Sequence, residues 1–248
     1  MRRLLPILGS IVFFIISTSV LPLTHADAAS GVPILTYHYI RDYNYQKDPA
    51  GNTLSVSHAV FDQQMNYLVS HGYTPITLDT MYAIFNHQAP RPAKPIVLTF
   101  DDGYIDFYAN AYPILKKYNF HAVSFIVTDF VGRPAYLSWS NIKEMQASGL
   151  ISFEAHTTTH AYLPTLNYQA ALSELKNSKD TLQAQTGTIV NFIAYPYGAS
   201  NWNVQKAASR AGFVGGAGTW GGYASSQGMN MPRIAVRNSL QSVSSRFP

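Results

Sequence analysis

The regular alternation of short apolar segments with amphipathic segments most constrains how this chain can fold. Runs such as Pro95–Phe100 and Leu150–Ala155 have the length and composition of buried strands. The segment Tyr168–Thr186 places apolar residues at helical spacing, and Gly187 follows it as a stop signal. Strands that alternate with helices indicate a parallel sheet covered by helices. About seven strand–helix units predict an α/β fold with barrel-like closure.

The expected elements follow one another along the chain. Ser57 is a typical helix N-cap, and Phe61, Met65 and Leu68 follow it on one face. The expected strands lie at 32–38, 73–77, 95–100, 122–127, 150–155, 191–195, 213–217 and 233–236. The expected helices lie at 58–72, 78–85, 107–118, 141–147, 168–186 and 202–211, with a short last helix capped by Ser239.

The first 28 residues have the pattern of a secretory signal peptide. Met1–Arg3 is basic, Leu4–Val20 is apolar, and Ala26–Ala28 forms a small-residue cleavage site. We expect cleavage after Ala28, with cleavage after Ala26 as the second choice. The domain would then occupy residues 29–248 and be secreted, at the cell surface or in the cell wall. An uncleaved N-terminal anchor is the alternative, and no second apolar segment is long enough to span a membrane.

Composition excludes several classes of site and partner. The sequence contains no cysteine, which rules out disulfides and thiolate metal sites. The formal net charge is +4, but Lys and Arg form no cluster, so we expect no nucleic-acid partner. We expect a monomer whose stability comes from a conventional hydrophobic core.

Two polar segments follow expected strands. Asp101 and Asp102 come directly after the strand at 95–100, and His156 and His160 follow the strand at 150–155. Carboxyl ends of parallel strands meet at one edge of a sheet, where α/β folds carry their chemistry. One Asp and two His would give a metal three protein ligands and an open position, with a second Asp as a base for water. Each segment alone would also fit an ordinary polar turn or loop.

With a third segment, Ala194–Gly198, this chain resembles the polysaccharide deacetylase family, the NodB-homology domain of carbohydrate esterase family four. The resemblance runs from about Pro33 to the C-terminus. Thr99–Tyr104 looks like the family's first motif, His156–His160 like the second and Ala194–Gly198 like the third, which lines the substrate groove. The resemblance implies a distorted (β/α) barrel, the NodB-homology fold.

The resemblance also implies roles for individual residues. Asp101 would be the catalytic base, and Asp102, His156 and His160 would hold one divalent metal ion. Zn²⁺ is the expected ion, although Ni²⁺, Co²⁺ or Fe²⁺ suits the same ligands. A backbone N–H near Tyr197 would stabilise the oxyanion.

The chain departs from the family pattern at two places. Ala194 stands where the family usually carries an Arg, and no Asp precedes Trp220 to orient one. We therefore expect Arg233 to hold the Asp101 carboxylate. No His follows His160, so the usual C-terminal acid is missing. His38, in Leu35–Tyr39, is similar to the N-terminal acid histidine of the poly-N-acetylglucosamine deacetylase branch.

These residues predict a metal-dependent hydrolase that removes N-acetyl groups from a GlcNAc-containing polysaccharide. The polymer could be exopolysaccharide poly-GlcNAc, peptidoglycan or a chitin-like chain. An O-acetyl esterase acting on xylan-type polysaccharide is one alternative, and it would depend less on His38. A non-catalytic, secreted polysaccharide-binding module is the other, although such a module would need no base at Asp101. Tyr37, Tyr39, Tyr104, Trp139 and Trp220 could stack on sugar rings or pack in the core.

Overall fold

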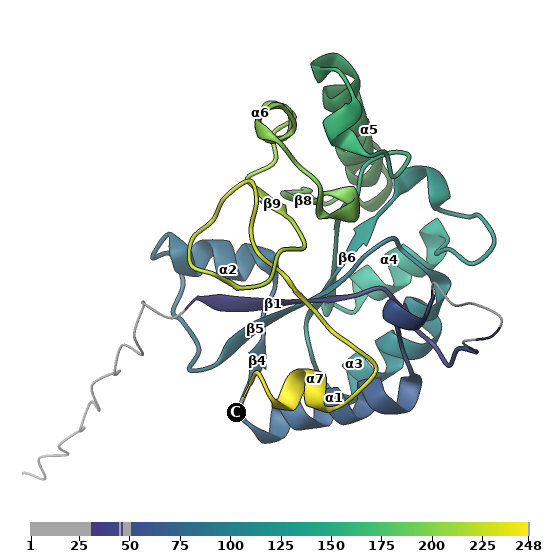
Figure 1. Ribbon diagram of the computed structural model, residues 1–248, viewed down its shortest axis with the longest axis vertical. Coiled ribbons are helices and arrows are strands. Elements are labelled where there is room, and N and C mark those ends of the chain that lie inside the picture. The colour runs from purple at the N-terminus through teal and green to yellow at the C-terminus, as the bar shows by residue number, and fades with distance from the viewer. Residues whose placement is uncertain (1–30, 45, 47–50, 248) are drawn as a thin grey trace, which may run out of the picture.

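The computed structural model describes residues 31–44, 46 and 51–247 of the 248-residue chain (Figure 1). The expected signal peptide at 1–28 lies outside the described residues. Within the described ranges, no helix is both long enough and apolar enough to cross a bilayer.

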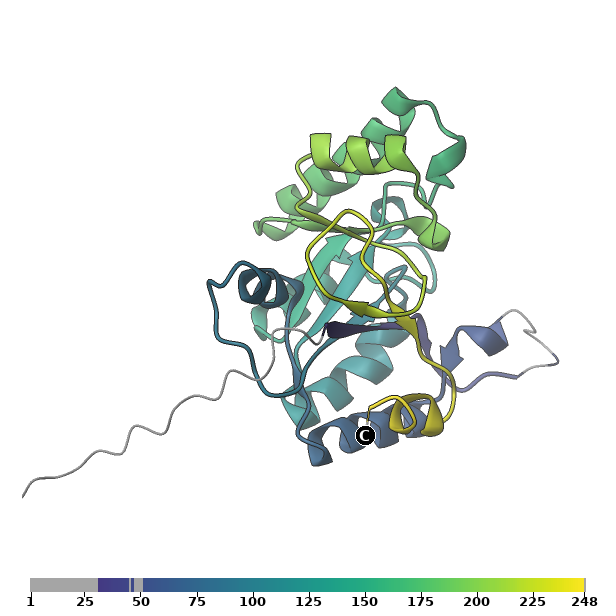
Figure 2. The same ribbon diagram turned by 60° about the vertical axis from the view of Figure 1, so that its left-hand side comes forward.

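A curled, mostly parallel sheet forms the centre of the molecule (Figures 1 and 2). Six strands lie in the order β1, β5, β6, β7, β8 and β9, and each pair of neighbours is parallel. Their bounds are Val32–Tyr37, Pro95–Phe100, Ala122–Ile126, Ile151–Ala155, Phe192–Ala194 and Gly215–Ala217. The expected α/β fold with a parallel sheet is therefore confirmed.

The chain's C-terminal segment connects the two ends of this curl. β11 (Ile234–Ala235) pairs in parallel with β1, and Met231 forms a parallel bridge to Ala217 at the end of β9. The N–H of Val236 then donates to the carbonyl of Thr36 at 3.1 Å. First and last strands are thus joined through one extended segment, which gives the sheet the form of a distorted barrel.

Three short strand pairings complete the sheets. β10 (Tyr223–Ala224) pairs antiparallel with the start of β1, and β4 (Thr74–Pro75) pairs in parallel with β5. β2 (Tyr39–Ile40) and β3 (Ser55–Val56) form a separate parallel pair that sequence patterns did not predict.

Seven α-helices surround the sheet in the described part of the chain. They are α1 (His58–Ser70), α2 (Leu78–Phe85), α3 (Tyr112–Tyr118), α4 (Trp139–Ala147), α5 (Tyr168–Thr186), α6 (Trp202–Arg210) and α7 (Gln241–Ser244). α5 and α6 lie side by side at the top of Figures 1 and 2, and α7 lies beside α1 at the bottom.

Two helix starts differ from the sequence expectation. The helix expected at 107–118 begins with a π-helical turn over Phe107–Ala111 before α3. α4 begins at Trp139 rather than Asn141, because Ser138 is its N-cap. Ser138 Oγ accepts from the N–H of Asn141, and Asn141 Oδ1 accepts from the N–H of Ser138. Asn at this position replaces the Glu or Gln of the usual capping box, which hid the signal.

Successive residues of each strand point to opposite faces of the sheet and belong to two different hydrophobic clusters. This alternation determines the face on which the site residues lie. On β1, Leu35 belongs to the cluster under most of the helices, whereas Ile34 belongs to a cluster in which strands from both ends of the sheet meet. The second cluster therefore fills the concave side of the sheet, where α2 also packs. His38 and Asp101 continue the register of Ile34 and Val97, so they emerge on the concave side at the carboxyl ends of β1 and β5.

Candidate active site

The neighbouring carboxylates of Asp101 and Asp102 face different partners because the backbone turns sharply between them. Asp101 follows β5, and its N–H donates to the carbonyl of Tyr37 at 3.0 Å. Asp102 has a φ of 73°, in the left-handed region that residues other than Gly seldom adopt. Gly103, with a φ of 74°, follows it, and a Cβ there would lie 3.0 Å from Ile126 Cδ1. This turn separates the two acidic groups.

Asp102 lies with His156 and His160 in a cluster suited to a metal ion. Asp102 Oδ1 lies 3.2 Å from Nε2 of each histidine. Tetrahedral zinc ligands about 2.0–2.1 Å from the ion lie about 3.3 Å from one another. Asp102 Oδ1 is buried and has no hydrogen-bond partner among the described residues, as expected of an oxygen that faces a cation. These three residues fit a divalent metal ion.

The tautomer of His156 supports the same assignment. Its Nδ1 lies 2.7 Å from the carbonyl oxygen of Ala194, which can only accept a hydrogen bond. Nδ1 therefore carries a proton, which leaves Nε2 as the ring nitrogen that faces Asp102 and could bind a metal ion. The alanine found in place of the family's usual arginine thus contributes its backbone to the site.

Arg233 holds Asp101 from the opposite side. Its Nη1 and Nη2 donate to the two carboxylate oxygens at 2.7 Å each, and its Nε donates to the carbonyl of Gly218 at 2.8 Å. Asp101 and Arg233 are only 3% and 1% exposed. Burial acts to raise the pKa of Asp101, but the guanidinium of Arg233, together with His156 and His38, holds that pKa below its usual range. Asp101 is therefore an ionised carboxylate.

His38 lies beside this ion pair. Its Nε2 is 3.9 Å from Asp101 Oδ2. Burial lowers the pKa of His38 despite the opposing charges of Asp101 and Asp102. Once protonated, such a ring is a stronger acid than an ordinary histidine.

Tyr197 lies on the rim of the site. It has a φ of 59°, and its exposed ring packs against the ring of His160 with centroids 4.7 Å apart. Gly198 follows with a φ of 67°, and a Cβ there would lie 2.0 Å from Thr219 Oγ1. This segment is therefore pressed against the 218–220 loop, with little room for other residues.

Residues 88–216 match the family model described as polysaccharide deacetylase. The chain belongs to the polysaccharide deacetylase family. The matched span contains the Asp pair, the histidine loop and Tyr197, whereas His38 and Arg233 lie outside it.

Two sequence relatives and one solved structure illustrate how similar this deacetylase family member is to known proteins. YxkH of Bacillus subtilis (strain 168), a protein named for this family, is 35% identical over 199 residues, covering 80% of this chain and 68% of YxkH. The poly-beta-1,6-N-acetyl-D-glucosamine N-deacetylase of Staphylococcus aureus (strain MRSA252) is 31% identical over 204 residues, covering 72% of this chain and 70% of that protein. The solved structure of Streptococcus pyogenes deacetylase PplD in complex with acetate superposes with a TM-score of 0.82 and 31% identity, covering 89% of this chain and 99% of PplD. The expected family fold is thereby confirmed.

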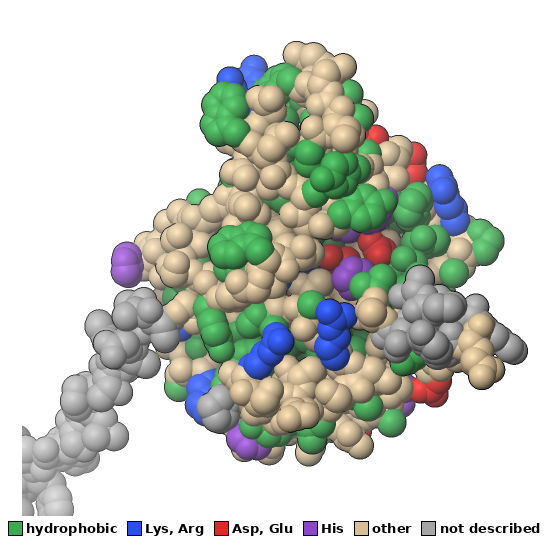
Figure 3. Space-filling view, in the orientation of Figure 1, with side chains coloured by type: hydrophobic (Ala, Val, Ile, Leu, Met, Phe, Trp, Pro, Cys, Tyr) green, Lys and Arg blue, Asp and Glu red, His purple; other side chains and the backbone are tan. Residues whose placement is uncertain are grey.

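An aromatic band that sequence patterns only partly indicated crosses the site of this deacetylase family member. Ring centroids 3.9–6.4 Å apart link Tyr39, Tyr104, Tyr136, Phe130, His160, Tyr197 and Tyr162 in that order. Figure 3 shows hydrophobic side chains gathered around the exposed Asp and His atoms. Phe130, Tyr136 and Tyr162 carried no sequence signal because they come from loops and a short 3₁₀ turn. Tyr37 is not part of the band, since it is buried and donates to Gln64 Oε1.

Proposed function

We propose that this protein is a metal-dependent N-deacetylase that removes acetyl groups from a GlcNAc-containing polysaccharide. The separation of the two neighbouring carboxylates carries the proposal: Asp102 faces two histidines, whereas Asp101 is held ionised by Arg233. A metal site and a separate base are what hydrolysis of an acetyl group requires. The similarity to a poly-beta-1,6-N-acetyl-D-glucosamine N-deacetylase supports an amide substrate.

In this proposal each residue has a distinct task. A divalent ion held by Asp102, His156 and His160, with zinc as first choice, would polarise the acetyl carbonyl and make a nearby water more acidic. Asp101 accepts the proton of the attacking water. His38 gives a proton to the sugar nitrogen, because an amine leaves poorly without one. A backbone N–H near Tyr197 donates to the developing oxyanion. The products are acetate and a glucosamine unit.

The aromatic band suits a polysaccharide substrate, because faces of aromatic rings pack well against the apolar faces of sugars. We further propose that residues 29–248 form the catalytic domain of a monomeric protein that acts outside the cell or in the wall, after removal of a signal peptide at 1–28. A plain binding module is disfavoured because it would not need an arginine-held carboxylate beside its metal.

An O-deacetylase is the second candidate, and the pKa of His38 is the observation that favours it. Burial lowers that pKa, so the neutral ring predominates at neutral pH. An alcohol leaves an ester more easily than an amine leaves an amide, so an esterase would depend less on a protonated His38.

Acetate release from three substrates tests these alternatives. Zinc-loaded protein would be incubated with β-1,6-linked GlcNAc oligomers, chitin oligomers and acetylated xylan, with chelator-treated protein and the isosteric Asp101→Asn variant as controls. Release from a GlcNAc oligomer that the chelator and the variant both abolish would support the proposal. Release from xylan alone would favour the esterase. Full activity of Asp101→Asn would contradict the assigned base.

A further inference from the structure

The four-residue step from His156 to His160 contains a strained backbone. Thr157 has a φ of 66° and His160 a φ of 64°, both in the left-handed region. Such residues cost on the order of 1–3 kcal/mol each and persist only where the surroundings hold them. Thr157 is β-branched, which makes this conformation especially unfavourable. The distance between the two histidine rings therefore depends on what restrains this loop.

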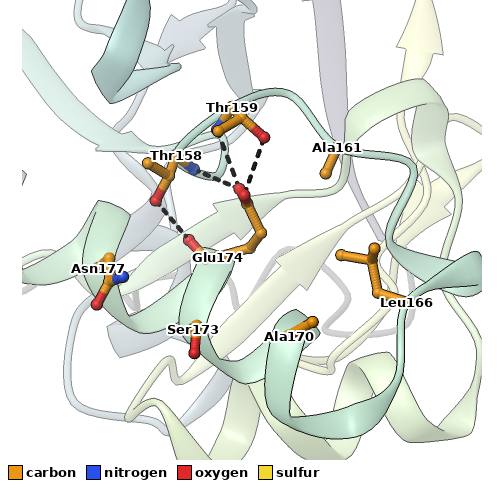
Figure 4. A pocket seen from close by; sticks show the side chains of 8 residues that line it. All are labelled: Thr158, Thr159, Ala161, Leu166, Ala170, Ser173, Glu174 and Asn177. Atoms are coloured by element: carbon orange, nitrogen blue, oxygen red, sulfur yellow. Dashed lines mark hydrogen bonds between the residues drawn. The ribbon is translucent and has the colours of Figure 1, made fainter.

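Glu174, on α5, contacts this loop at four points (Figure 4). Its Oε2 accepts from the N–H groups of both Thr158 and Thr159 at 3.0 Å each, and its Oε1 accepts from Thr159 Oγ1 at 2.9 Å. Its backbone carbonyl accepts from Thr158 Oγ1 at 3.1 Å. One residue thus satisfies two successive backbone N–H groups and two hydroxyl groups between the histidines.

On its opposite side the loop accepts two backbone hydrogen bonds. The N–H of Thr128 donates to the carbonyl of Thr157 at 3.3 Å, and the N–H of Asp129 donates to that of Thr158 at 3.0 Å. The loop is therefore held between the start of a 3₁₀ turn (Thr128–Phe130) and the Glu174 carboxylate.

On the side that faces α5, few side chains pack against the loop between His156 and His160. A cavity of about 400 Å³ lies there, and Thr158, Thr159 and Glu174 are among the residues that line it. Its presence means that loss of the carboxylate would leave the loop room to relax toward the helix. The position of His160 relative to His156 would change with it.

We propose that Glu174 is a positioning residue for the metal site, which acts through the backbone of Thr158 and Thr159 without touching the ion. The proposal rests on the assignment of Asp102, His156 and His160 as metal ligands. Glu174 lies beyond the motif segment in the sequence, so the motif alone gave no sign of it.

Zinc affinity, measured by competition with a chromophoric chelator, tests this role. Residues that orient metal ligands typically change metal affinity by about 10–100-fold when removed, and we expect Glu174→Ala to weaken zinc binding by such a factor. Glu174→Gln should stay closer to the unaltered protein, because its amide oxygen can accept both N–H groups and its amide nitrogen can donate to Thr159 Oγ1. Glu144→Ala removes an exposed carboxylate on α4 that accepts only from Tyr108 in the described structure, and it should leave affinity unchanged.

Two further readouts separate positioning from general stability. The absorption spectrum of the Co²⁺-loaded protein should change in Glu174→Ala and not in Glu144→Ala, since it reports ligand geometry. The thermal midpoint of the metal-free variants reports stability alone. Zinc affinity of Glu174→Ala within twofold of the unaltered protein would overturn the proposal, whatever happens to the midpoint.

A variant at Thr159 covers the case in which Glu174→Ala does not fold. Thr159 is exposed, and Thr159→Val removes one hydroxyl contact to Glu174 Oε1. One hydrogen bond corresponds to a loss of about 2–10-fold in zinc affinity, and no loss would count against the proposal. Failure of the unaltered protein to bind zinc would instead overturn the metal site itself, which is a distinguishable result.

Discussion

Arg233 holds both oxygens of the Asp101 carboxylate at 2.7 Å, although 132 residues separate the two in the sequence. The guanidinium is a planar fork that matches the two oxygens, and a third contact to Gly218 fixes its plane. Asp101 consequently keeps its charge and one orientation, while its neighbour Asp102 faces the histidines. The arrangement gives adjacent acidic residues separate electrostatic surroundings.

Removal of Arg233 should destabilise the protein strongly. Arg233→Met would leave the buried Asp101 carboxylate unpaired, and breaking a buried pair in this way costs about 3–5 kcal/mol. Arg233→Lys keeps the positive charge but loses the planar guanidinium. Its free energy of unfolding should lie between those of the unaltered protein and Arg233→Met. The free energy of unfolding, measured in urea, checks this, with the exposed Arg210→Met on α6 as the control. Equal stability of the Arg233→Met and Arg210→Met variants would contradict the expectation.

The same pair makes stability depend on pH. The pKa of Asp101 lies below its unfolded value of about 3.9, so its ionised form stabilises the fold above about pH 4. This contribution is lost as the pH falls through the lower folded pKa. The stability difference between the unaltered protein and Arg233→Met should therefore shrink in strong acid.

His38→Ala should distinguish amide from ester hydrolysis. Loss of a general acid typically lowers the rate by about 10²–10⁴-fold, and the proposed role assigns that loss to the amide substrate. An aryl acetate ester, whose leaving group needs no proton, should be affected much less. The measurement is kcat/KM for both substrates with the same preparation. An equal loss on both would mean that His38 orients Asp101 instead of donating a proton.

Tyr162 should contribute to substrate binding and leave the chemical step unchanged. It is 50% exposed and belongs to the aromatic band through a ring contact of 5.9 Å with Tyr197. An aromatic contact of about 0.5–1.5 kcal/mol corresponds to a rise in KM of about 2–10-fold for Tyr162→Ala on oligomers. Tyr223 is a matched control, because it is 48% exposed and pairs with Pro33 at the far end of β1. A fall in kcat with KM unchanged would place Tyr162 in the chemistry instead.

Because of Asp106, the protein should be less stable above about pH 6 than below about pH 4. Burial raises its pKa to about 6, and its Oδ1 has no hydrogen-bond partner among the described residues. Between about pH 4 and 6 the folded protein holds a proton that the unfolded chain has released, so stability falls as the pH rises through this window. Asp106→Asn mimics the protonated group and should be more stable by about 1–2 kcal/mol at pH 8, with a smaller gain at pH 4.

Urea unfolding at both pH values measures this difference. Asp180→Asn, at an exposed carboxylate on α5, controls for the loss of one negative charge. A gain for Asp106→Asn that is the same at pH 4 and pH 8 would show that the effect comes from the amide itself rather than from titration.

Local sequence signals predicted those helices and strands that are determined by their own apolar pattern and end signals. Pro95–Phe100 and Tyr168–Thr186 have the bounds expected from their apolar runs and stop signals. The motif segments lie at the ends of β5 and β7. Their position could be predicted because the end of an apolar run marks the end of a strand. The β2–β3 pairing and the π-helical turn were missed because neither has a periodic pattern of its own.

Contacts between residues far apart in the sequence limited how much of the candidate site could be predicted. Asp102, His156 and His160 could be grouped because each follows a strand of the same parallel sheet. Glu174 and the aromatic loop residues could not be grouped in advance, since their positions depend on how loops and α5 fold over the sheet edge. Arg233 was selected because the family's usual arginine was missing at Ala194, a clue that comes from the resemblance.

The closure of the sheet by Met231–Ala235 has a consequence for biosynthesis. A growing chain contains all three candidate metal ligands once residue 160 is made, but Arg233 is made 73 residues later, together with β11. Proteolytic trimming of the C-terminal segment would likewise leave those ligands in the chain and remove the guanidinium that orients Asp101. The orientation of the candidate base therefore depends on the segment Met231–Ala235, whereas the presence of the candidate metal ligands in the chain does not.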